Sequence, residues 1–147
     1  MKKVVFILIM CLITFAGFAQ QYVDLGLPSG TQWKTTNESG YYTYDQAVAA
    51  FGRNLPSKSQ LIELNEKCSW EWSGNGYKVI GPNGNSIFLP AAGFYYEDID
   101  YYVGSQGFYV SSSAYDSKDV WFLGFSSSNR WISNLYRIYK RSVRLVR

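Results

Sequence analysis

The chain has 147 residues, of which 47% are hydrophobic, 18% aromatic and 17% charged, with a formal net charge of +3 and no histidine. This composition is too apolar and too aromatic for a disordered chain, and the length suits one domain with a real core. Without histidine, Ser-His-Asp and Cys-His catalysis and histidine-based metal sites are excluded.

The N-terminus has the three-part pattern of a secretory signal peptide. Residues 1–3 carry two lysines, residues 4–15 are almost entirely apolar, and residues 16–19 place small side chains before a cleavage site. The pattern predicts removal of residues 1–19 and a single domain over residues 20–147, secreted to the periplasm, the cell surface or the medium. The apolar run is too short to span a bilayer, so we expect no stable membrane insertion after cleavage.

Cysteine usage limits the chemistry further. After cleavage Cys68 is the only cysteine in the sequence, so the mature chain has no intrachain disulfide and no thiolate metal cluster. The sequence contains no glycine-rich phosphate-binding motif. We therefore expect a protein that is not an enzyme, uses no cofactor or metal, and acts by binding.

The first half of the chain predicts two short strands followed by two short helices. The expected strands are rich in β-formers and cover residues 20–27 and 31–36. The first helix, residues 45–51, has apolar residues at helical spacing. Ser57 is a typical N-cap for the second helix, which is expected to end near Lys67.

The second half predicts β-strands separated by turns. Apolar runs or alternation indicate strands over residues 70–72, 77–80, 86–90, 107–111, 120–125, 130–132 and 142–146. An Asn-Gly pair at residues 83–84 between two apolar runs is a strong hairpin signal. Residues 97–104 are expected to form a polar, tyrosine-rich loop. Two helices followed by a long β part indicate an α+β protein rather than a parallel α/β protein.

Six phrases carry a resemblance to a known family, and they occur in order along the mature chain: Val23–Thr31, Leu55–Ser57, Ile87–Gly93, Gly107–Tyr109, Ser111–Ser113 and Ser142–Arg147. They resemble the Fibrobacter succinogenes-type major paralogous domain found in exported proteins of Bacteroidetes and their relatives. The resemblance implies a C-type-lectin-like fold. In that fold two short helices precede a twisted antiparallel β-sheet, and the N- and C-terminal strands are adjacent.

The resemblance also implies two kinds of relative. Formylglycine-generating, sulfatase-modifying oxidases use a pair of active-site cysteines, and the single mature Cys68 argues against a degenerate enzyme of that type. Retroelement-diversified variable proteins instead bind ligands through the last part of the chain. The corresponding stretch here lies between Ser113 and Ser142, so the resemblance favours an adhesin-like binding protein, whose gene is a candidate for such diversification.

The stretch from Tyr115 to Tyr139 combines aromatic side chains with small polar ones, which is typical of recognition surfaces. The predicted ligand-binding residues are Tyr115, Trp121, Arg130, Trp131, Asn134, Tyr136, Arg137 and Tyr139. Their aromatic rings suit an extracellular protein or a glycan, because such rings give a large contact area and stack on sugar rings. The alternative is that these rings face the core.

Two charged features have simpler interpretations. The sequence after Asp119 contains basic residues and no acidic residue, and we interpret the basic residues as the solvent face of a C-terminal strand that includes Arg144. An anionic polysaccharide or an acidic protein stays an alternative partner for them. Export argues against a nucleic-acid partner. The acidic residues 97–100 lack the spacing of an EF-hand, so a solvated loop is expected rather than a calcium site. The alternative function is that of a structural subunit in a surface assembly. The sequence leaves the oligomeric state open.

Overall fold

The computed structural model describes residues 21–147, and the predicted signal peptide, residues 1–19, lies outside the described residues. The strands are β1 (Tyr22–Asp24), β2 (Gln32–Lys34), β3 (Ser69–Trp72), β4 (Gly76–Ile80), β5 (Ser86–Pro90), β6 (Phe94–Tyr96), β7 (Ile99–Tyr101), β8 (Gly107–Ala114), β9 (Asp119–Phe125) and β10 (Arg130–Tyr136). The helices are α2 (Tyr44–Phe51) and α3 (Lys58–Lys67), with the 3-10 turn η1 (Gly52–Asn54) between them.

Both helices begin at local sequence signals. The hydroxyls of Thr43 and Ser57 accept hydrogen bonds from the backbone N–H groups of Gln46 and Gln60, respectively. The two glutamine side chains accept hydrogen bonds from the backbone N–H groups of the capping residues, which completes a capping box at each helix. The predicted cap at Ser57 and the predicted helix end near Lys67 are therefore confirmed.

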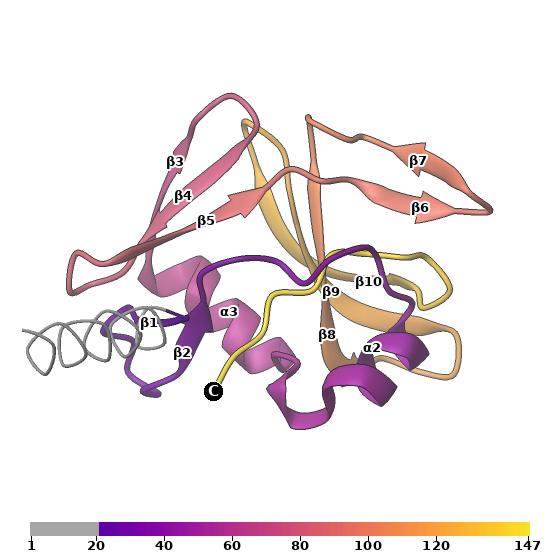
Figure 1. Cartoon of the computed structure of the whole chain (residues 1–147), viewed down its shortest axis with the longest axis horizontal. Coiled ribbons are helices and arrows are strands. Elements are labelled where there is room, and N and C mark those ends of the chain that lie inside the picture. Colours follow the sequence, from indigo (N-terminus) through magenta and orange to yellow (C-terminus); the bar gives the residue numbers. More distant parts are fainter. Residues whose placement is uncertain (1–20) are drawn as a thin grey trace, which may run out of the picture.

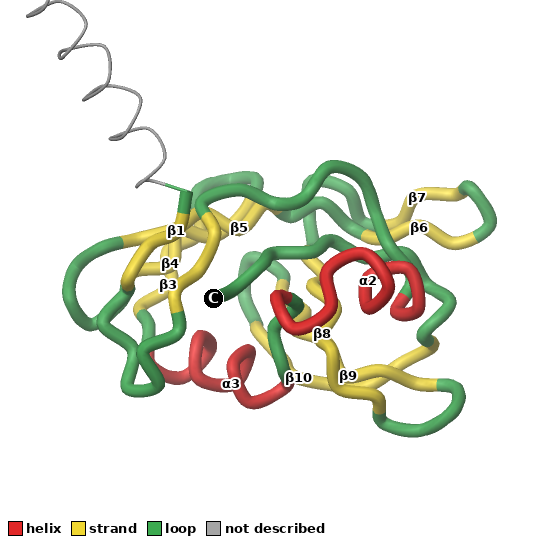
Figure 2. Tube along the Cα trace, turned by 60° about the horizontal axis from the view of Figure 1, so that its bottom comes forward, coloured by secondary structure: helices red, strands yellow, loops and turns green. Residues whose placement is uncertain are grey.

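The strands of residues 21–147 pair in four small antiparallel sheets: β1–β2, β3–β4–β5, β6–β7 and β10–β9–β8. Each pairing joins strands that are neighbours in sequence. In Figure 1 the two helices lie in the lower part of the view, α3 below the β3–β4–β5 sheet and α2 beside β8. Figure 2 shows that the β6–β7 hairpin projects from the end of the molecule opposite to β1.

The predicted α+β, C-type-lectin-like fold is wrong. It required one twisted antiparallel sheet after the two helices, whereas the described residues are mostly β-strand in four separate small sheets with two short helices. The physical reason is that turn and strand patterns specify local hairpins, whereas a single sheet also needs backbone pairing between hairpins. Several strands, such as β1 and β6, are only three residues long and provide little edge for such pairing.

The C-terminal segment also differs from its prediction. Residues 142–146 form isolated bridges to Tyr109 and Trp33 instead of a strand. The predicted solvent-exposed face of arginines is wrong as well, because Arg141 and Arg144 are each 1% exposed. Their guanidinium groups reach backbone carbonyls inside the molecule, so these two cations have a structural role.

The predicted loop over residues 97–104 contains strand β7, which pairs with β6. Tyr96 and Ile99 are opposite each other across a turn whose two central residues are Glu97 and Asp98. Both have positive φ, 50° and 60°, as a type I′ hairpin turn requires. The loop prediction failed because such turns normally carry Asn or Gly, which are absent from this turn.

Apolar packing joins the separate sheets. The larger core connects α3, the β3–β4–β5 sheet and β9, and includes Leu61, Leu64, Val79, Leu89 and Phe125. A smaller cluster connects α2 to β8 and the C-terminal segment through Ala47, Val110 and Val143. These two cores hold the β8–β9–β10 sheet in place, and the predicted site residues lie on this sheet and in the segments next to it.

Candidate binding surface

A continuous cluster of aromatic rings connects the β6–β7 hairpin to the end of β10 and the turn that follows it. Its members, called the aromatic surface below, are Phe94, Tyr96, Tyr101, Tyr102, Tyr136 and Tyr139. Phe94 stacks on both Tyr101 and Tyr139, with ring centroids 4.9 Å apart in each pair. Tyr96 and Tyr136 contact Tyr139 edge-on at 5.1 and 5.5 Å. Such pairs contribute about 0.5–1.5 kcal/mol each beyond area burial, so they favour one arrangement of the rings.

The aromatic surface is anchored to the body of the protein at two points. The ring of Phe94 packs edge-on against Phe108 of β8 at 5.0 Å, and Phe108 is buried. On the opposite side of β6, Tyr95 and Lys140 exchange two backbone hydrogen bonds of 2.9 Å. These bonds hold the turn containing Tyr139 beside β6, although the two segments are more than forty residues apart in the sequence.

The outer side of this cluster is open to solvent. Tyr102 is 54% exposed and Tyr136 is 49% exposed. The exposed aliphatic side chains on the hairpin and around the end of β10 are Ile99, Val103, Leu135 and Ile138. Exposed large apolar side chains concentrated on neighbouring segments are typical of interaction sites.

An open cavity of about 630 Å³ adjoins the aromatic surface at Tyr136. Its charged lining residues are Arg137, Asp45 and Lys118, and the NH2 group of Arg137 lies 2.9 Å from Oδ1 of Asp45. The same guanidinium lies 4.4 Å from the ring centroid of Tyr44 and donates to the backbone carbonyl of Ser117. These contacts hold Arg137 in one orientation beside the aromatic rings.

The loop between β8 and β9 forms the rim of this cavity and is ordered by Asp116. The Oδ1 atom of Asp116 accepts hydrogen bonds from the backbone N–H groups of Lys118 at 2.8 Å and Asp119 at 2.7 Å. These two bonds lower the pKa of the Asp116 carboxyl group below its ordinary value. The bonded turn places the exposed Lys118 at the cavity, where it adds a second positive charge beside Arg137.

Trp131 supports the aromatic surface from behind. It lies opposite Gly124 of β9, and its ring centroid is 6.3 Å from that of Phe108. A Cβ atom on Gly124 would overlap the indole, so the glycine makes room for the ring. Trp131 is half-buried, and it stabilises Phe108, on which Phe94 packs.

The structure separates the other predicted residues from the aromatic surface. Tyr115 and Trp121 contact each other edge-on at 5.5 Å, and the ammonium group of Lys58 lies 3.4 Å from the centroid of a Trp121 ring. Asn134 is opposite Trp121 in the sheet. Arg130 lies at the start of β10, at the other end of the strand from Tyr136. The eight predicted residues therefore belong to three places, and Tyr136, Arg137 and Tyr139 are the ones that the structure brings together.

Four residues of the aromatic surface were missed by sequence reasoning: Phe94, Tyr96, Tyr101 and Tyr102. The density of aromatic residues between positions 94 and 102 is a signal for them. Interpreting the segment as a polar loop hides the hairpin that aligns these rings. The contact with Tyr139 depends on long-range packing and has no local sequence signature.

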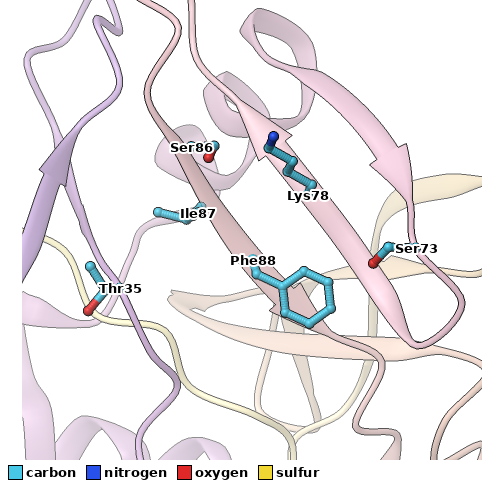
Figure 3. A pocket seen from close by; sticks show the side chains of 6 residues that line it. All are labelled: Thr35, Ser73, Lys78, Ser86, Ile87 and Phe88. Carbon is cyan, nitrogen blue, oxygen red and sulfur yellow. The ribbon is translucent and has the colours of Figure 1, made fainter.

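Another hollow, of about 440 Å³, lies against β4 and β5 (Figure 3). Lys78 and Phe88 are opposite each other on these strands, and Thr35, which follows β2, is on the far side. Lys78 is the single charged residue in its lining. This hollow contains none of the predicted site residues and offers one aromatic ring, so the aromatic surface is the better candidate.

Cys68 lies at the C-terminal end of α3 and is half-buried. Burial, followed by the nearby charge of Glu63, raises the pKa of its thiol to about 11. Within residues 21–147 no group of three or more Cys, Asp or Glu side chains is arranged to hold a metal ion. In the same part of the chain, no helix is both long enough and apolar enough to cross a membrane.

The fold and the site describe a mostly β-strand protein with an exposed cluster of aromatic rings beside a cationic cavity. The chain belongs to the family described as Domain of unknown function (DUF8237), whose sequence model matches residues 56–146. The match begins just before α3 and includes β3 to β10, so it covers the whole aromatic surface. No curated protein and no solved structure matches the chain.

Proposed function

We propose that this chain is a non-catalytic binding protein that recognises another extracellular protein through the aromatic surface. The observation that carries the proposal is the cluster of stacked rings, which is anchored on Phe108 and exposed at Tyr102 and Tyr136. Tyrosine is enriched in protein interfaces because it gives a large contact area for little loss of side-chain entropy. Secretion follows from the predicted signal peptide and is part of the proposal.

The neighbouring residues favour a protein over a glycan as the ligand. Exposed Ile99, Val103 and Ile138 flank the rings, and these aliphatic side chains gain stability only against an apolar partner. A sugar would offer hydroxyl groups to them. Protein interfaces commonly combine an aromatic and aliphatic centre with a charged rim.

The charges around the rings differ between the two ends of the surface. The tip of the hairpin carries Glu97, Asp98 and Asp100, whereas the cavity beside Tyr136 is lined by the cations Lys118 and Arg137 and by one acid, Asp45, so its net charge is positive. A partner with cations opposite the hairpin tip and acids opposite the cavity would be favoured by electrostatic complementarity. This polarity gives the surface a preferred orientation for its partner.

The backbone of the hairpin supports a functional role. The non-glycine residues with positive φ in residues 21–147 are Glu97, Asp98 and Tyr102, and all three lie in or next to the hairpin. Each such conformation costs about 1–2 kcal/mol for an L-residue. Strain of this kind concentrates at functional sites, where it is retained because it positions particular side chains.

The raised pKa of the Cys68 thiol supports a non-catalytic function. A nucleophilic or redox-active cysteine needs a thiolate near neutral pH, which requires a lowered pKa. With a pKa of about 11, Cys68 remains a neutral thiol. This side chain therefore suits a packing role better than the chemistry of an oxidase.

The test is to screen the purified protein on an array of extracellular proteins and on a glycan array, and to measure Kd for each hit. Tyr102→Ser and Tyr136→Ser remove exposed rings from the aromatic surface. Tyr115→Ser is the matched control, because Tyr115 is 55% exposed and lies elsewhere. We expect a protein hit whose Kd rises about tenfold or more in the first two variants and is unchanged in the control.

Two results would contradict the proposal. One is binding to glycans alone, which would replace the protein ligand with a sugar. The other is a protein hit that is weakened equally by Tyr115→Ser, which would place the binding site outside the aromatic surface. Self-association, measured by sedimentation in all variants, separates a structural assembly role from recognition of a different protein.

A further inference from the structure

A smaller hollow, of about 320 Å³, lies at the opposite end of β10 from the aromatic surface. It is bounded by the end of α3, by β3 and β4, and by the loop of residues 127–129 between β9 and β10. Its lining includes Asn65, Trp70, Trp72, Tyr77 and Arg130. Because β10 extends from Arg130 to Tyr136, the two sites are roughly 20 Å apart.

Aromatic rings form one wall of this hollow. Trp70 and Trp72 are two residues apart on β3, so their side chains project from the same face of the strand. Each packs edge-on against Tyr77 of β4, with ring centroids at 5.4 and 5.1 Å, respectively. Both tryptophans are half-buried and pack against the larger core, which fixes the orientation of the wall.

Hydrogen-bond donors gather beside the rings. Arg130 donates from Nε to Oδ1 of Asn65 at 2.8 Å, and its guanidinium lies 4.9 Å from the centroid of a Trp70 ring. Among the described residues, no acceptor bonds to the two terminal NH groups of Arg130, to Nδ2 of Asn65 or to Nε1 of Trp72. The lining contains no carboxylate, so Arg130 gives the hollow a net positive charge.

We propose that this hollow binds one unit of an acidic saccharide, such as a uronic acid within a polysaccharide. The accessible surface of the lining is mostly polar, which matches the hydroxyl groups of a sugar ring, and the indole N–H of Trp72 is one of its donors. The amide of Asn65 and the loop of residues 127–129 face its hydroxyl groups, and the guanidinium fork of Arg130 matches a carboxylate in two parallel hydrogen bonds. The volume lies at the lower end of the roughly 300–1,000 Å³ range of small-molecule sites, which suits a single sugar ring.

The contacts already present prepare Arg130 for this role. Its Nε bond to Asn65 and its packing on Trp70 hold the guanidinium in place before a ligand arrives. Preorganised donors lose little freedom on binding, which increases affinity. This saccharide site is independent of the proposed protein-binding surface, because it uses different residues at the other end of β10.

The experiment is a calorimetric titration of the purified protein with oligomers of galacturonate, of mannuronate and of a glucuronate-containing glycosaminoglycan. The matched ligand is the methyl ester of the same oligomer, which keeps the sugar ring and removes the charge. We expect at least one uronate to bind, with Kd about tenfold or more weaker for its ester and for Arg130→Gln. Arg53→Gln is the matched control, since Arg53 is exposed and outside the lining.

A second measurement does not depend on the folding of a variant. In the NMR spectrum of the unsubstituted protein, the indole Nε1–H signal of Trp72, assigned with Trp72→Phe, should shift on titration with the bound uronate. The signal of Trp121, near α3, should stay unchanged. The proposal is overturned if none of the three uronates binds with a millimolar or lower Kd, if ester and acid bind equally, or if the shift occurs at Trp121 instead of Trp72.

Discussion

The buried Arg144 gives the sharpest test of how the C-terminal segment is held. Its guanidinium donates from Nε to Oδ1 of Asn37 at 2.9 Å, from NH1 to the carbonyl of Lys34 at 3.1 Å, and from NH2 to the carbonyl of Phe88. Asn37 in turn donates to the hydroxyl of Tyr109. One side chain thus links the C-terminal segment to β2, to the loop after it and to β5.

The cost of removing these bonds can be worked from the contacts. Arg144→Met keeps the apolar stem and removes every donor, leaving two carbonyls and the Asn37 amide oxygen without their partner. Each orphaned acceptor costs about 1–3 kcal/mol when buried. Burial also lowers the pKa of Arg144, because its charged form is desolvated. Removing this charge therefore offsets part of the free energy of unfolding that is lost with the hydrogen bonds. We expect a net loss of about 3 kcal/mol in the free energy of unfolding.

Arg144→Lys is the more informative variant, because we expect it to be less stable than Arg144→Met. A lysine ammonium carries its three donors on one nitrogen, so it cannot reach three acceptors from three separate segments. It would retain the cost of a buried charge while satisfying fewer partners. The exposed Arg147, whose Nε donates to the side chain of Gln32, provides the control: Arg147→Met should change stability by less than about 0.5 kcal/mol.

Urea unfolding followed by tryptophan fluorescence measures these differences, and the slope of each transition checks that the variants unfold from comparable native states. A loss of about 3 kcal/mol should also lower Tm by on the order of 10 °C. The reasoning is refuted if Arg144→Lys unfolds like the parent protein, since the guanidinium fork would then be unnecessary. It is also refuted if Arg147→Met is as damaging as Arg144→Met.

Three further predictions concern other parts of the molecule. Gly124→Ala should displace Trp131, because the added Cβ atom would overlap the indole, and should lower the free energy of unfolding by about 1–3 kcal/mol. Tryptophan fluorescence should change as well, and an unchanged spectrum and Tm would contradict the predicted overlap. Burial raises the pKa of the Cys68 thiol from 9.0 to about 11 in the folded protein, so its thiolate fraction at pH 8 is about a hundredfold lower than that of an unperturbed cysteine. The rate of alkylation by iodoacetamide should therefore keep rising up to about pH 11 in the folded protein. A rate that levels off near pH 9 would contradict this. Asp98→Gly should relieve a positive φ and raise stability by about 1 kcal/mol, or Tm by about 4 °C; a lower Tm would show that the Asp98 side chain stabilises the turn.

The features that could be predicted from the sequence are those with local signals. The cap at Ser57 forms because a hydroxyl and a glutamine three residues later can bond within one turn of chain. Strands β4 and β5 join where an Asn-Gly pair separates two apolar runs. In both cases the interacting residues lie only a few positions apart in the sequence, so these local structures depend little on tertiary packing.

The features that could not be predicted depend on contacts between distant segments. The division into four sheets follows from how the hairpins pack, which strand patterns do not encode. The burial of Arg141 has the same origin: its NH1 group bonds to the carbonyl of Tyr136, and its guanidinium lies 4.7 Å from the ring centroid of Phe122. An arginine in a β-rich segment normally indicates solvent exposure, and carbonyl acceptors in the interior leave no mark in the sequence.

The candidate site shows the same division. The chemical composition of residues 115–139 predicts side chains suited to recognition, but strand alternation sends them to different faces and ends of the sheet. Tyr139 contacts the hairpin and Tyr136 packs on Tyr139, whereas Trp121 lies beside Lys58 of α3. The four missed members of the aromatic surface lie in residues 94–102, where the pairing of β6 with β7 aligns the rings.

Strand β10 explains how the described residues 21–147 can present two surfaces with different chemistry. Its register with β9 places Arg130 opposite Phe125 and Tyr136 opposite Asp119, so each end of the strand is fixed by the same ladder. The Arg130 end meets tryptophans from β3, which border a small and mostly polar hollow beside a cation. The Tyr136 end connects through Tyr139 to the β6–β7 hairpin, whose rings and aliphatic side chains form the proposed protein-binding surface. A shift of the strand by one residue would turn both side chains to the other face, so the register of β10 determines both surfaces at once.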